Sequence, residues 1–344
     1  MSAGPGAPPP PAAVMQMMMG AWTAQTISAV TRLHVPELLD KHGPLTAREL
    51  TETHGVDAKP DFLERALRVC ASVGVFTEAA DGRFGPTPLS EVLTPDSPAS
   101  VHAFVELIGG RWWKLIGALP EALRTGQNQA KAQTGREPWE PGDTSREEQF
   151  GRAMRSRVES TRGVLEHYDF TGARTVVDVG GGFGHLALAI LQRYPAVRAT
   201  VLDLPDVIAI ARRHAAHEDA GVLERLTFVV GDMFIDVPPG DVYLLKTVIH
   251  DWDDAHCVQV LQRCRARLPA DGRIICADKV LPPMGDTGAS GSKLLDMLMM
   301  VSLPGKERTE AEWRALYERA GLRVASITVV NPRSGESLVQ GVAA

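Results

Sequence analysis

The chain has 344 residues, of which 44% are hydrophobic and 23% charged, and its formal net charge is −6. A single hydrophobic core usually stops growing near ~250 residues, so this length predicts two domains of an ordinary globular protein. The acidic balance excludes a general attraction to nucleic acid or to anionic membranes. The four cysteines include no CxxC pair, and they predict neither a disulfide framework nor a zinc site.

Two segments bear on the location of the protein. Residues 1–15 are rich in proline and lack the basic and apolar regions of a signal peptide, which predicts a disordered leader. Residues 294–303 are the most apolar helical stretch, but they are far shorter than the ~20 residues of a membrane span and include Asp296. We therefore expect a cytoplasmic protein with no membrane partner.

Residues 16–99 predict a small domain of three helices and a hairpin. Apolar residues recur at helical spacing in the first helix, and Thr46 and Glu49 have the pattern of a capping box at the second. An Asp-Gly turn separates the two strands of the hairpin. The expected bounds of the three helices and the hairpin are 17–41, 46–55, 60–74 and 75–87. This order of elements is the outline of a winged helix.

A winged helix raises the question of DNA binding, and the charge of the domain answers it. Residues 1–95 contain seven Lys or Arg against ten Asp or Glu, a net charge of −3. A duplex-binding module is normally basic along one face, because neutralised phosphates supply most of its affinity. We therefore expect no nucleic-acid partner.

The second half of the chain has the pattern of an α/β domain. Residues 100–168 predict a mostly helical linker, and residues 169–344 then alternate apolar strands with amphipathic helices. Continuous Val/Ile/Leu strands in such an order predict a doubly wound parallel sheet that is covered on both faces. The stretches 322–330 and 337–343 lie close in sequence and are expected to pair as an antiparallel edge.

The run "DVGGGFG" at residues 178–184 follows the first of these strands, where ligands of such sheets usually bind. Gly180 and Gly182 fit a dinucleotide fingerprint, but its third position is His185, and the Lys-Ser/Thr of a P-loop is missing. An acid that leads a G-x-G-x-G run resembles the first motif of S-adenosylmethionine-dependent methyltransferases. Glycines allow the backbone to approach a nucleoside closely, and Asp178 suits a ligand with a positive end.

Further cofactor candidates end the next strands. Asp203, followed by Leu204, has the position of a carboxylate that binds a ribose diol, although it could instead cap the next helix. Asp232 and Met233 follow the third strand, where an acid and a flat apolar side chain could meet an adenine. A turn aspartate and a core methionine are the alternative. Lys246 ends the fourth strand.

His250 follows the fourth strand and is the candidate general base. In methyl transfer from a sulfonium, a phenol attacks well only after it has lost its proton. The pKa of a phenol is near ~10 and that of histidine near ~6.5, so moving the proton from phenol to imidazole costs ~5 kcal/mol in water. A base that removes the proton in place reduces this cost. The resulting imidazolium needs a carboxylate to orient it, and Asp278 and Glu307 are the candidates. Glu307 is not needed as a helix cap, because Thr309 and Glu312 already form a capping box.

The segment 250–256, "HDWDDAH", could be mistaken for a metal site, since it holds two histidines and three aspartates. Metal ligands must converge on one point, whereas these residues leave a strand and enter a helix. Asp253 and Asp254 are more simply explained as caps of that helix. We expect no metal.

Nearly the whole chain resembles the caffeic acid and hydroxyindole type of small-molecule O-methyltransferases. The motifs "DVGGGFG", "LDLP", "GDMF", "KTVIHDWDDAHC", "LPADGRIICADKVLP" and "GKERTEAEW" occur in that family's order. The resemblance implies a Rossmann-like class I methyltransferase domain, an N-terminal winged-helix dimerisation domain and a homodimer. It implies S-adenosylmethionine as methyl donor and S-adenosylhomocysteine as product. One departure matters, because plant members usually carry glutamate where this chain has the shorter Asp278.

The resemblance also assigns roles to individual residues. The implied catalytic residues are His250, Asp278 and Glu307, and the implied cofactor-binding residues are Asp178, Gly180, Gly182, Asp203, Leu204, Asp232, Met233 and Lys246. The expected substrate pocket comprises Trp112, Phe150, Met154, Asp251, Met297 and Met300, for most of which core packing is the alternative. Deformable methionines suit a flat ring, so we expect a phenolic or polycyclic aromatic secondary metabolite as acceptor.

Two other functions are compatible with parts of this pattern. An enzyme on the same scaffold could use bound S-adenosylmethionine in the decarboxylation or hydroxylation of an aromatic polyketide. A winged-helix regulator could carry a nucleoside-sensing domain, although the acidic N-terminal domain argues against it. A histidine with carboxylate partners favours methyl transfer, because a phenol needs a base there.

Overall fold

The computed structural model describes three stretches of the chain, residues 8–155, 158–288 and 290–344. The described residues divide into two compact units, one comprising those up to Trp113 together with 152–155 and the other comprising Lys114–Gly151 together with those from 158 to Ala344. The segment 100–168, which was expected to be a linker, therefore does not form a unit of its own. In the described part of the chain no helix is both long and apolar enough to cross a membrane.

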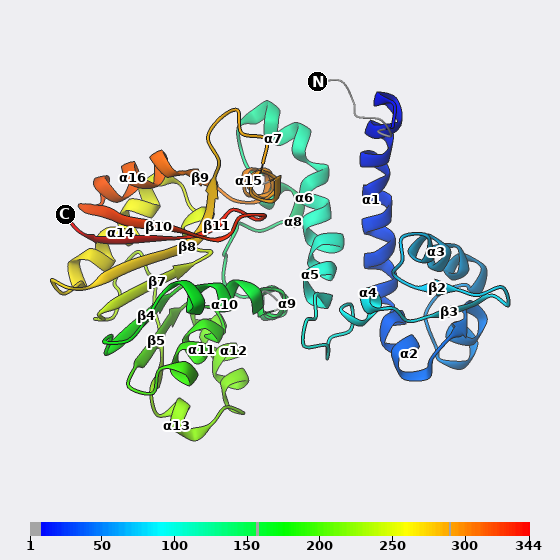
Figure 1. Cartoon of the computed structure of the whole chain (residues 1–344), viewed down its shortest axis with the longest axis horizontal. Coiled ribbons are helices and arrows are strands. Elements are labelled where there is room, and N and C mark those ends of the chain that lie inside the picture. The colour runs from blue at the N-terminus through cyan, green and yellow to red at the C-terminus, as the bar shows by residue number, and fades with distance from the viewer. Residues whose placement is uncertain (1–7, 156–157, 289) are drawn as a thin grey trace. The chain divides into compact units, whose positions relative to one another are not determined.

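The first unit has the winged-helix outline that the sequence predicts (Figure 1). Its three-stranded sheet has the order β1-β3-β2, and a buried core that includes Leu39, Leu50, Leu67 and Phe84 lies between the helices and the sheet. The elements of this part are α1 Pro10–Arg32, α2 Val35–His42, β1 Leu45–Thr46, η1 Glu49–Thr53, α3 Pro60–Ser72, β2 Thr77–Glu78, β3 Arg83–Gly85, α4 Pro88–Glu91, α5 His102–Leu107 and η2 Ile108–Trp112.

Two expectations for the N-terminus are wrong. Helix α1 begins at Pro10, inside the stretch expected to be a disordered leader. Proline is well tolerated at the first helical position, because its missing N–H has no partner there and its φ is already helical. The single helix expected at 17–41 is two helices, since His34 adopts a left-handed φ of 57° between α1 and α2.

The second unit contains the predicted sheet, with strand order β10-β11-β8-β7-β4-β5-β6 and with β9 paired to β8 (Figure 1). The strands from β8 to β6 along this order are parallel, and β10 and β11 form the predicted antiparallel edge. The strands are β4 Thr175–Val179, β5 Arg198–Asp203, β6 Leu226–Val230, β7 Val242–Lys246, β8 Arg273–Leu281, β9 Arg308–Thr309, β10 Leu322–Asn331 and β11 Glu336–Ala343.

Helices cover both faces of this sheet (Figure 1). The helices from Trp113 onward are α6 Trp113–Gly117, α7 Leu119–Thr125, α8 Ala130–Thr134, α9 Thr144–Arg155, α10 Val158–His167, α11 His185–Arg193, α12 Pro205–Ala215, α13 Ala220–Leu223, η3 Ile249–Asp251, α14 Asp254–Arg267, α15 Ser290–Ser302 and α16 Glu310–Arg319. Of these, α10 to α14 and α16 contribute to the apolar cores on the two faces of the sheet. The chain order reverses at β4, which pairs with β5 on one side and β7 on the other. Ligands of doubly wound sheets bind beside such a point.

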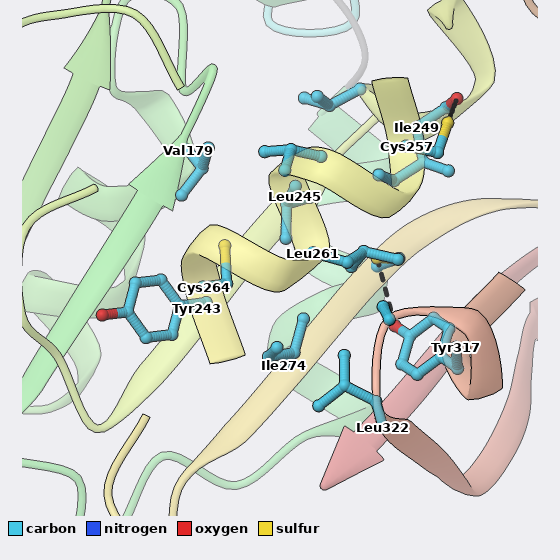
Figure 2. Packing of buried hydrophobic residues seen from close by; sticks show 14 of the residues in the cluster. Val179, Tyr243, Leu245, Ile249, Cys257, Leu261, Cys264, Ile274, Tyr317 and Leu322 are labelled. Carbon is cyan, nitrogen blue, oxygen red and sulfur yellow. Dashed lines mark hydrogen bonds between the residues drawn. The ribbon is translucent and has the colours of Figure 1, made fainter. Parts of the chain in front are cut away.

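The two faces of the sheet carry separate apolar cores, because successive strand residues point to opposite faces. Val176 belongs to the core that includes α11 and α12, and Val177 belongs to the core that includes α14 and α16. Figure 2 shows part of the second core, including Tyr317. The Tyr317 hydroxyl donates to the Val339 carbonyl at 3.0 Å and contacts the Cys276 sulfur at 3.1 Å. The packed sheet thus forms a rigid base for the loops at its carboxyl edge.

Candidate functional site

The glycine bend after β4 has a backbone that few other residues could adopt. Gly180 and Gly182 have φ values of 64° and 59°, in the left-handed region that favours glycine. A Cβ on Gly180 would lie 3.0 Å from the side chain of Val248, whereas one on Gly182 would meet no atom within 4 Å. The bend therefore presents bare backbone to open space at Gly182.

Asp203 ties the end of β5 to this bend. One of its carboxylate oxygens accepts the Gly182 N–H at 2.8 Å, and the other accepts the Leu204 N–H at 2.7 Å. Helix α12 receives no side-chain cap at its first residue, so the helix-cap alternative for Asp203 does not hold. Burial raises the pKa of Asp203 above its ordinary value.

Asp178 lies beneath the bend and is only 2% exposed. Its Cγ is 2.6 Å from where a Cβ on Gly181 would lie, so the backbone of the bend rests directly on the carboxyl group. Burial raises the pKa of Asp178 to about 7, although the positive charge of Lys246 acts in the opposite direction. One Asp178 oxygen has no hydrogen-bond partner among the described residues.

The residues after β6 show the structural roles that the sequence left open. Asp232 accepts the Phe234 N–H at 2.8 Å, as a turn aspartate does. Met233 is partly buried and packs against the core on the α14 side. Both residues still lie at the carboxyl edge of the sheet, where a cofactor could contact them. Their role in cofactor binding stays a prediction.

His250 lies in η3, directly after β7, and three carboxylates surround its ring. Nδ1 is 2.8 Å from a Glu307 oxygen and 3.7 Å from an Asp278 oxygen. Nε2 is 3.3 Å from an Asp251 oxygen. All four side chains are buried. The hydrogen-bond partner of Nδ1 is therefore Glu307, and the shorter Asp278 lies farther from the ring. This contact orients the imidazole so that Nε2 points away from Glu307.

The charges of this cluster determine one another. Burial alone would lower the pKa of His250, but Asp278, Asp251 and Glu307 outweigh it and raise the pKa to about 10. Burial raises the pKa of Asp251 to about 7, against the attraction of His250. The imidazole is therefore a much stronger base here than in water.

The aspartates after His250 have different tasks. Asp253 caps α14 as predicted, since its carboxylate accepts the His256 N–H at 2.9 Å. Asp254 instead binds Arg308, at 2.8 Å. Within the described ranges, no group of three or more His, Cys, Asp or Glu side chains is arranged to hold a metal ion.

The residues expected to line the acceptor pocket fall in both units. Trp112, which packs edge-on against Phe104, and Met154 belong to the first unit. Phe150, which packs edge-on against Trp139, belongs to the second. Met297 is partly buried on α15, and Met300 on the same helix lines a cavity of about 930 Å³. That cavity is also lined by Asp296 and residues 303–306. The composition of the acceptor pocket stays a prediction.

Three residues near the cluster escaped the sequence reasoning. The backbone of Gly305 packs so closely against His250 and Asp251 that a Cβ there would overlap their main-chain atoms. Asp296 accepts the Glu307 N–H at 2.8 Å, and Arg308 is buried against the turn that carries His250. For Gly305 and Arg308 the available signal was their place beside Glu307 in "GKER", because a buried carboxylate usually has neighbours that fix it. Asp296 is eleven positions from Glu307 and carried no such signal.

Comparison with known proteins agrees with this geometry. Residues 116–323 match the O-methyltransferase domain, and residues 15–96 match the O-methyltransferase dimerisation domain. A mitomycin biosynthesis 6-O-methyltransferase of Streptomyces lavendulae is 37% identical over 317 residues, which cover 90% of this chain and 88% of that protein. The phenazine O-methyltransferase PhzM of Lysobacter antibioticus is 33% identical over 97% of each chain.

A solved structure extends the likeness to three dimensions. The human N-acetylserotonin methyltransferase in complex with S-adenosylmethionine superposes with a TM-score of 0.88, at 27% identity, over 99% of each chain. The chain therefore belongs to the O-methyltransferase family. It is an enzyme with a class I methyltransferase domain and an N-terminal dimerisation domain, and its methyl donor is S-adenosylmethionine.

The carboxyl edge of the sheet fits this donor chemically. The open space over Gly182 can admit a flat nucleoside without a side chain in the way. The buried Asp178 and the partly buried Asp203 give this corner an acidic character, which suits a ligand that carries a sulfonium and an ammonium group.

Proposed function

We propose that the enzyme methylates a phenolic hydroxyl of an aromatic secondary metabolite and that His250 accepts the proton of that hydroxyl. The observation that carries this proposal is the 2.8 Å contact between Nδ1 and Glu307, which leaves Nε2 as the nitrogen able to accept a proton. The names of the relatives support an aromatic or polycyclic acceptor, since one is named for mitomycin biosynthesis, one for a phenazine and one for N-acetylserotonin.

The environment of His250 supports its role as base. Neutral imidazole in water is a weaker base than phenolate by roughly 3.5 pKa units, which makes the transfer unfavourable by ~5 kcal/mol. The neighbouring carboxylates raise the pKa of His250 to about 10, against the effect of burial, and this value matches that of an ordinary phenol. Proton transfer from a phenol to neutral His250 is then nearly balanced, but a base with this pKa already carries a proton at neutral pH, so turnover is expected to rise as the pH approaches about 10.

The carboxylates have distinct parts in this proposal. Glu307 orients the ring and stabilises the imidazolium, and Asp278 adds charge from a longer distance. Asp251 lies beside Nε2, and its pKa of about 7, raised by burial, lets it hold a proton at neutral pH. A protonated Asp251 can donate a hydrogen bond to an acceptor oxygen placed at Nε2.

When bound, S-adenosylmethionine supplies the electrophilic methyl group. We propose that the residues that hold it are Asp178, Gly180, Gly182, Asp203, Leu204, Asp232, Met233 and Lys246. Gly180 and Gly182 give the backbone close access, and Asp203 fixes the end of β5 beside them. Of the residues that the sequence predicts for the acceptor pocket, we propose those of the second unit, which are Phe150, Asp251, Met297 and Met300.

We also propose a homodimer through the first unit. The match to a dimerisation domain supports it, and so does the surface of α1, where Met17, Met18 and Trp22 are each more than 60% exposed. Apolar side chains of this size gathered on one helix usually face a partner. A location in the cytoplasm stays a prediction.

The experiment that tests the proposed function compares wild type with His250→Ala. A panel of phenols is incubated with S-adenosylmethionine, and mass spectrometry detects the gain of one methyl group. With an acceptor found in this way, we expect His250→Ala to lower kcat by about 100-fold or more and to leave the calorimetric Kd for S-adenosylmethionine nearly unchanged. The control is His256→Ala, an exposed histidine on α14 that pairs with Asp253. Unchanged turnover in His250→Ala would overturn the proposed role.

A further inference from the structure

Arg308 is the residue whose position the proposed function leaves unexplained. It directly follows Glu307, and only 1% of its surface is exposed. Its backbone is paired in β9 with Val280 of β8, two residues beyond Asp278. A guanidinium this deeply buried requires several hydrogen-bond partners to offset its lost hydration.

The guanidinium finds these partners on the turn that carries His250. Nη1 donates to the Ile249 carbonyl at 3.1 Å, and Nη2 donates to the Trp252 carbonyl at 2.9 Å. These carbonyls lie one residue before and two residues after His250. Arg308 therefore holds both ends of the turn.

The remaining donors fix the guanidinium itself. Nε and Nη2 both donate to an Asp254 oxygen, at 3.1 and 2.8 Å, and Nη1 donates to the Lys306 carbonyl at 3.2 Å. These bonds engage the planar fork of an arginine, and a lysine ammonium has neither the number nor the geometry of donors to replace them. The neighbouring Gly305 strengthens the arrangement, since its backbone packs directly against His250 and Asp251.

We infer that Arg308 is a positioning residue for the proton transfer: it joins the turn that carries His250 to the segment that carries Glu307 and so sets the distance between the two side chains. This inference rests on the proposed function of His250 as base. The same hydrogen bonds also stabilise the buried guanidinium, so the test has to separate positioning from stability. The two carbonyl contacts fix the part of the backbone from which the imidazole projects.

The test uses Arg308→Lys with Arg319→Lys as matched control. Arg319 also contacts Asp254, at 3.4 Å, but it is half exposed. Turnover is measured with a weakly acidic phenol and with an acidic phenol that is already ionised at the assay pH. The pKa of His250 is followed by NMR in the enzyme without acceptor. A displaced base slows the reaction only of a phenol that still carries its proton. A general loss of folded or active enzyme would slow the reaction of both phenols equally, so the pair of substrates separates the two effects.

For Arg308→Lys we expect kcat to fall about 10-fold or more with the weakly acidic phenol and about 3-fold or less with the ionised one. The NMR pKa of His250 should fall because its carboxylates move away, the Kd for S-adenosylmethionine should stay within about 2-fold, and Arg319→Lys should resemble wild type. An equal loss with both phenols, or an unchanged His250 pKa, would overturn the inference.

Asp254→Ala is the second variant, for the case that Arg308→Lys does not fold. It removes two hydrogen bonds of the Arg308 guanidinium at a partly exposed position. It should show the same preference for the ionised phenol with a smaller loss, about 3-fold for the weakly acidic phenol; equal losses would again overturn the inference. If His250→Ala itself has full turnover with the weakly acidic phenol, the proposed function has failed, and that outcome is distinct from failure of Arg308→Lys alone.

Discussion

The two corners of the site are built in different ways. The donor corner, formed by the glycine bend and the ends of β4 and β5, consists largely of backbone, with Asp203 bonded to the amides of Gly182 and Leu204. The proton-transfer corner, formed by η3, β8 and residues 305–308, consists of buried side chains whose charges hold one another. The first offers an open surface to a ligand that has its own charge. The second holds buried carboxylates around His250, and these stabilise the proton that the imidazole takes from a neutral hydroxyl.

This difference predicts that substitutions in one corner will change the affinity for S-adenosylmethionine, whereas substitutions in the other will change kcat. Changes in the donor corner should weaken S-adenosylmethionine binding. Changes in the proton-transfer corner should slow the chemical step and leave donor binding intact. A variant of one corner that produced the effect expected for the other would break the comparison.

The largest effect is expected from Glu307→Gln. This change keeps the size of the side chain but removes the charge that orients and stabilises the imidazolium, so kcat should fall by about 100-fold. Asp278→Asn should cost less, because Asp278 is 3.7 Å from Nδ1 and Glu307 is 2.8 Å away. Steady-state kinetics with a weakly acidic phenol measures both losses. A larger loss for Asp278→Asn would show that the longer contact matters more in the reaction.

A smaller effect is expected from Asp203→Ala in the donor corner. Two backbone amides lose their acceptor, and the proposed contact with the ribose is lost as well, so the Kd for S-adenosylmethionine should rise about 10-fold. Asp206→Ala is the control, since Asp206 in the first turn of α12 accepts the Gly142 N–H at 2.8 Å and, in the described part of the chain, makes no hydrogen bond with the glycine bend. Calorimetry that gave equal affinity for wild type and Asp203→Ala would remove Asp203 from the donor site.

The smallest effect concerns stability against pH. Burial lowers the pKa of His250, but its carboxylates raise it from 6.5 to about 10 overall. The stabilisation linked to this raised pKa is complete below about pH 6.5 and is lost as the pH rises through about 10. Wild type should therefore lose more stability over this range than Glu307→Gln, in which the pKa is raised less. Urea unfolding across the range measures the difference, and parallel curves would contradict the assigned charges.

The two corners also differ in how far the sequence reveals them. The donor bend is one contiguous motif, so the residue types of 178–184 directly predict a bend that a ligand can approach closely. The strand pattern likewise predicts the sheet and its antiparallel edge. Apolar spacing alone did not predict the break at His34, but Pro36 in the first turn of α2 is a signal for a helix start.

The proton-transfer corner depends on contacts that only the fold assembles. His250 and Glu307 are 57 positions apart, and residue types could suggest both as partners but could not choose between Glu307 and Asp278. Arg308 carries no pattern that separates it from an exposed arginine. Its importance follows from burial and from its bonds to carbonyls of a distant turn.

The most direct test of the central claim, that His250 accepts the proton of the acceptor hydroxyl, is the ratio of turnover between wild type and His250→Ala across a series of phenols of increasing acidity. The account predicts a ratio of about 100 or more for weakly acidic phenols that falls toward one as the phenol becomes ionised in solution. A ratio that stays constant across the series would contradict the claim, because the loss would then be independent of the proton that His250 is proposed to take.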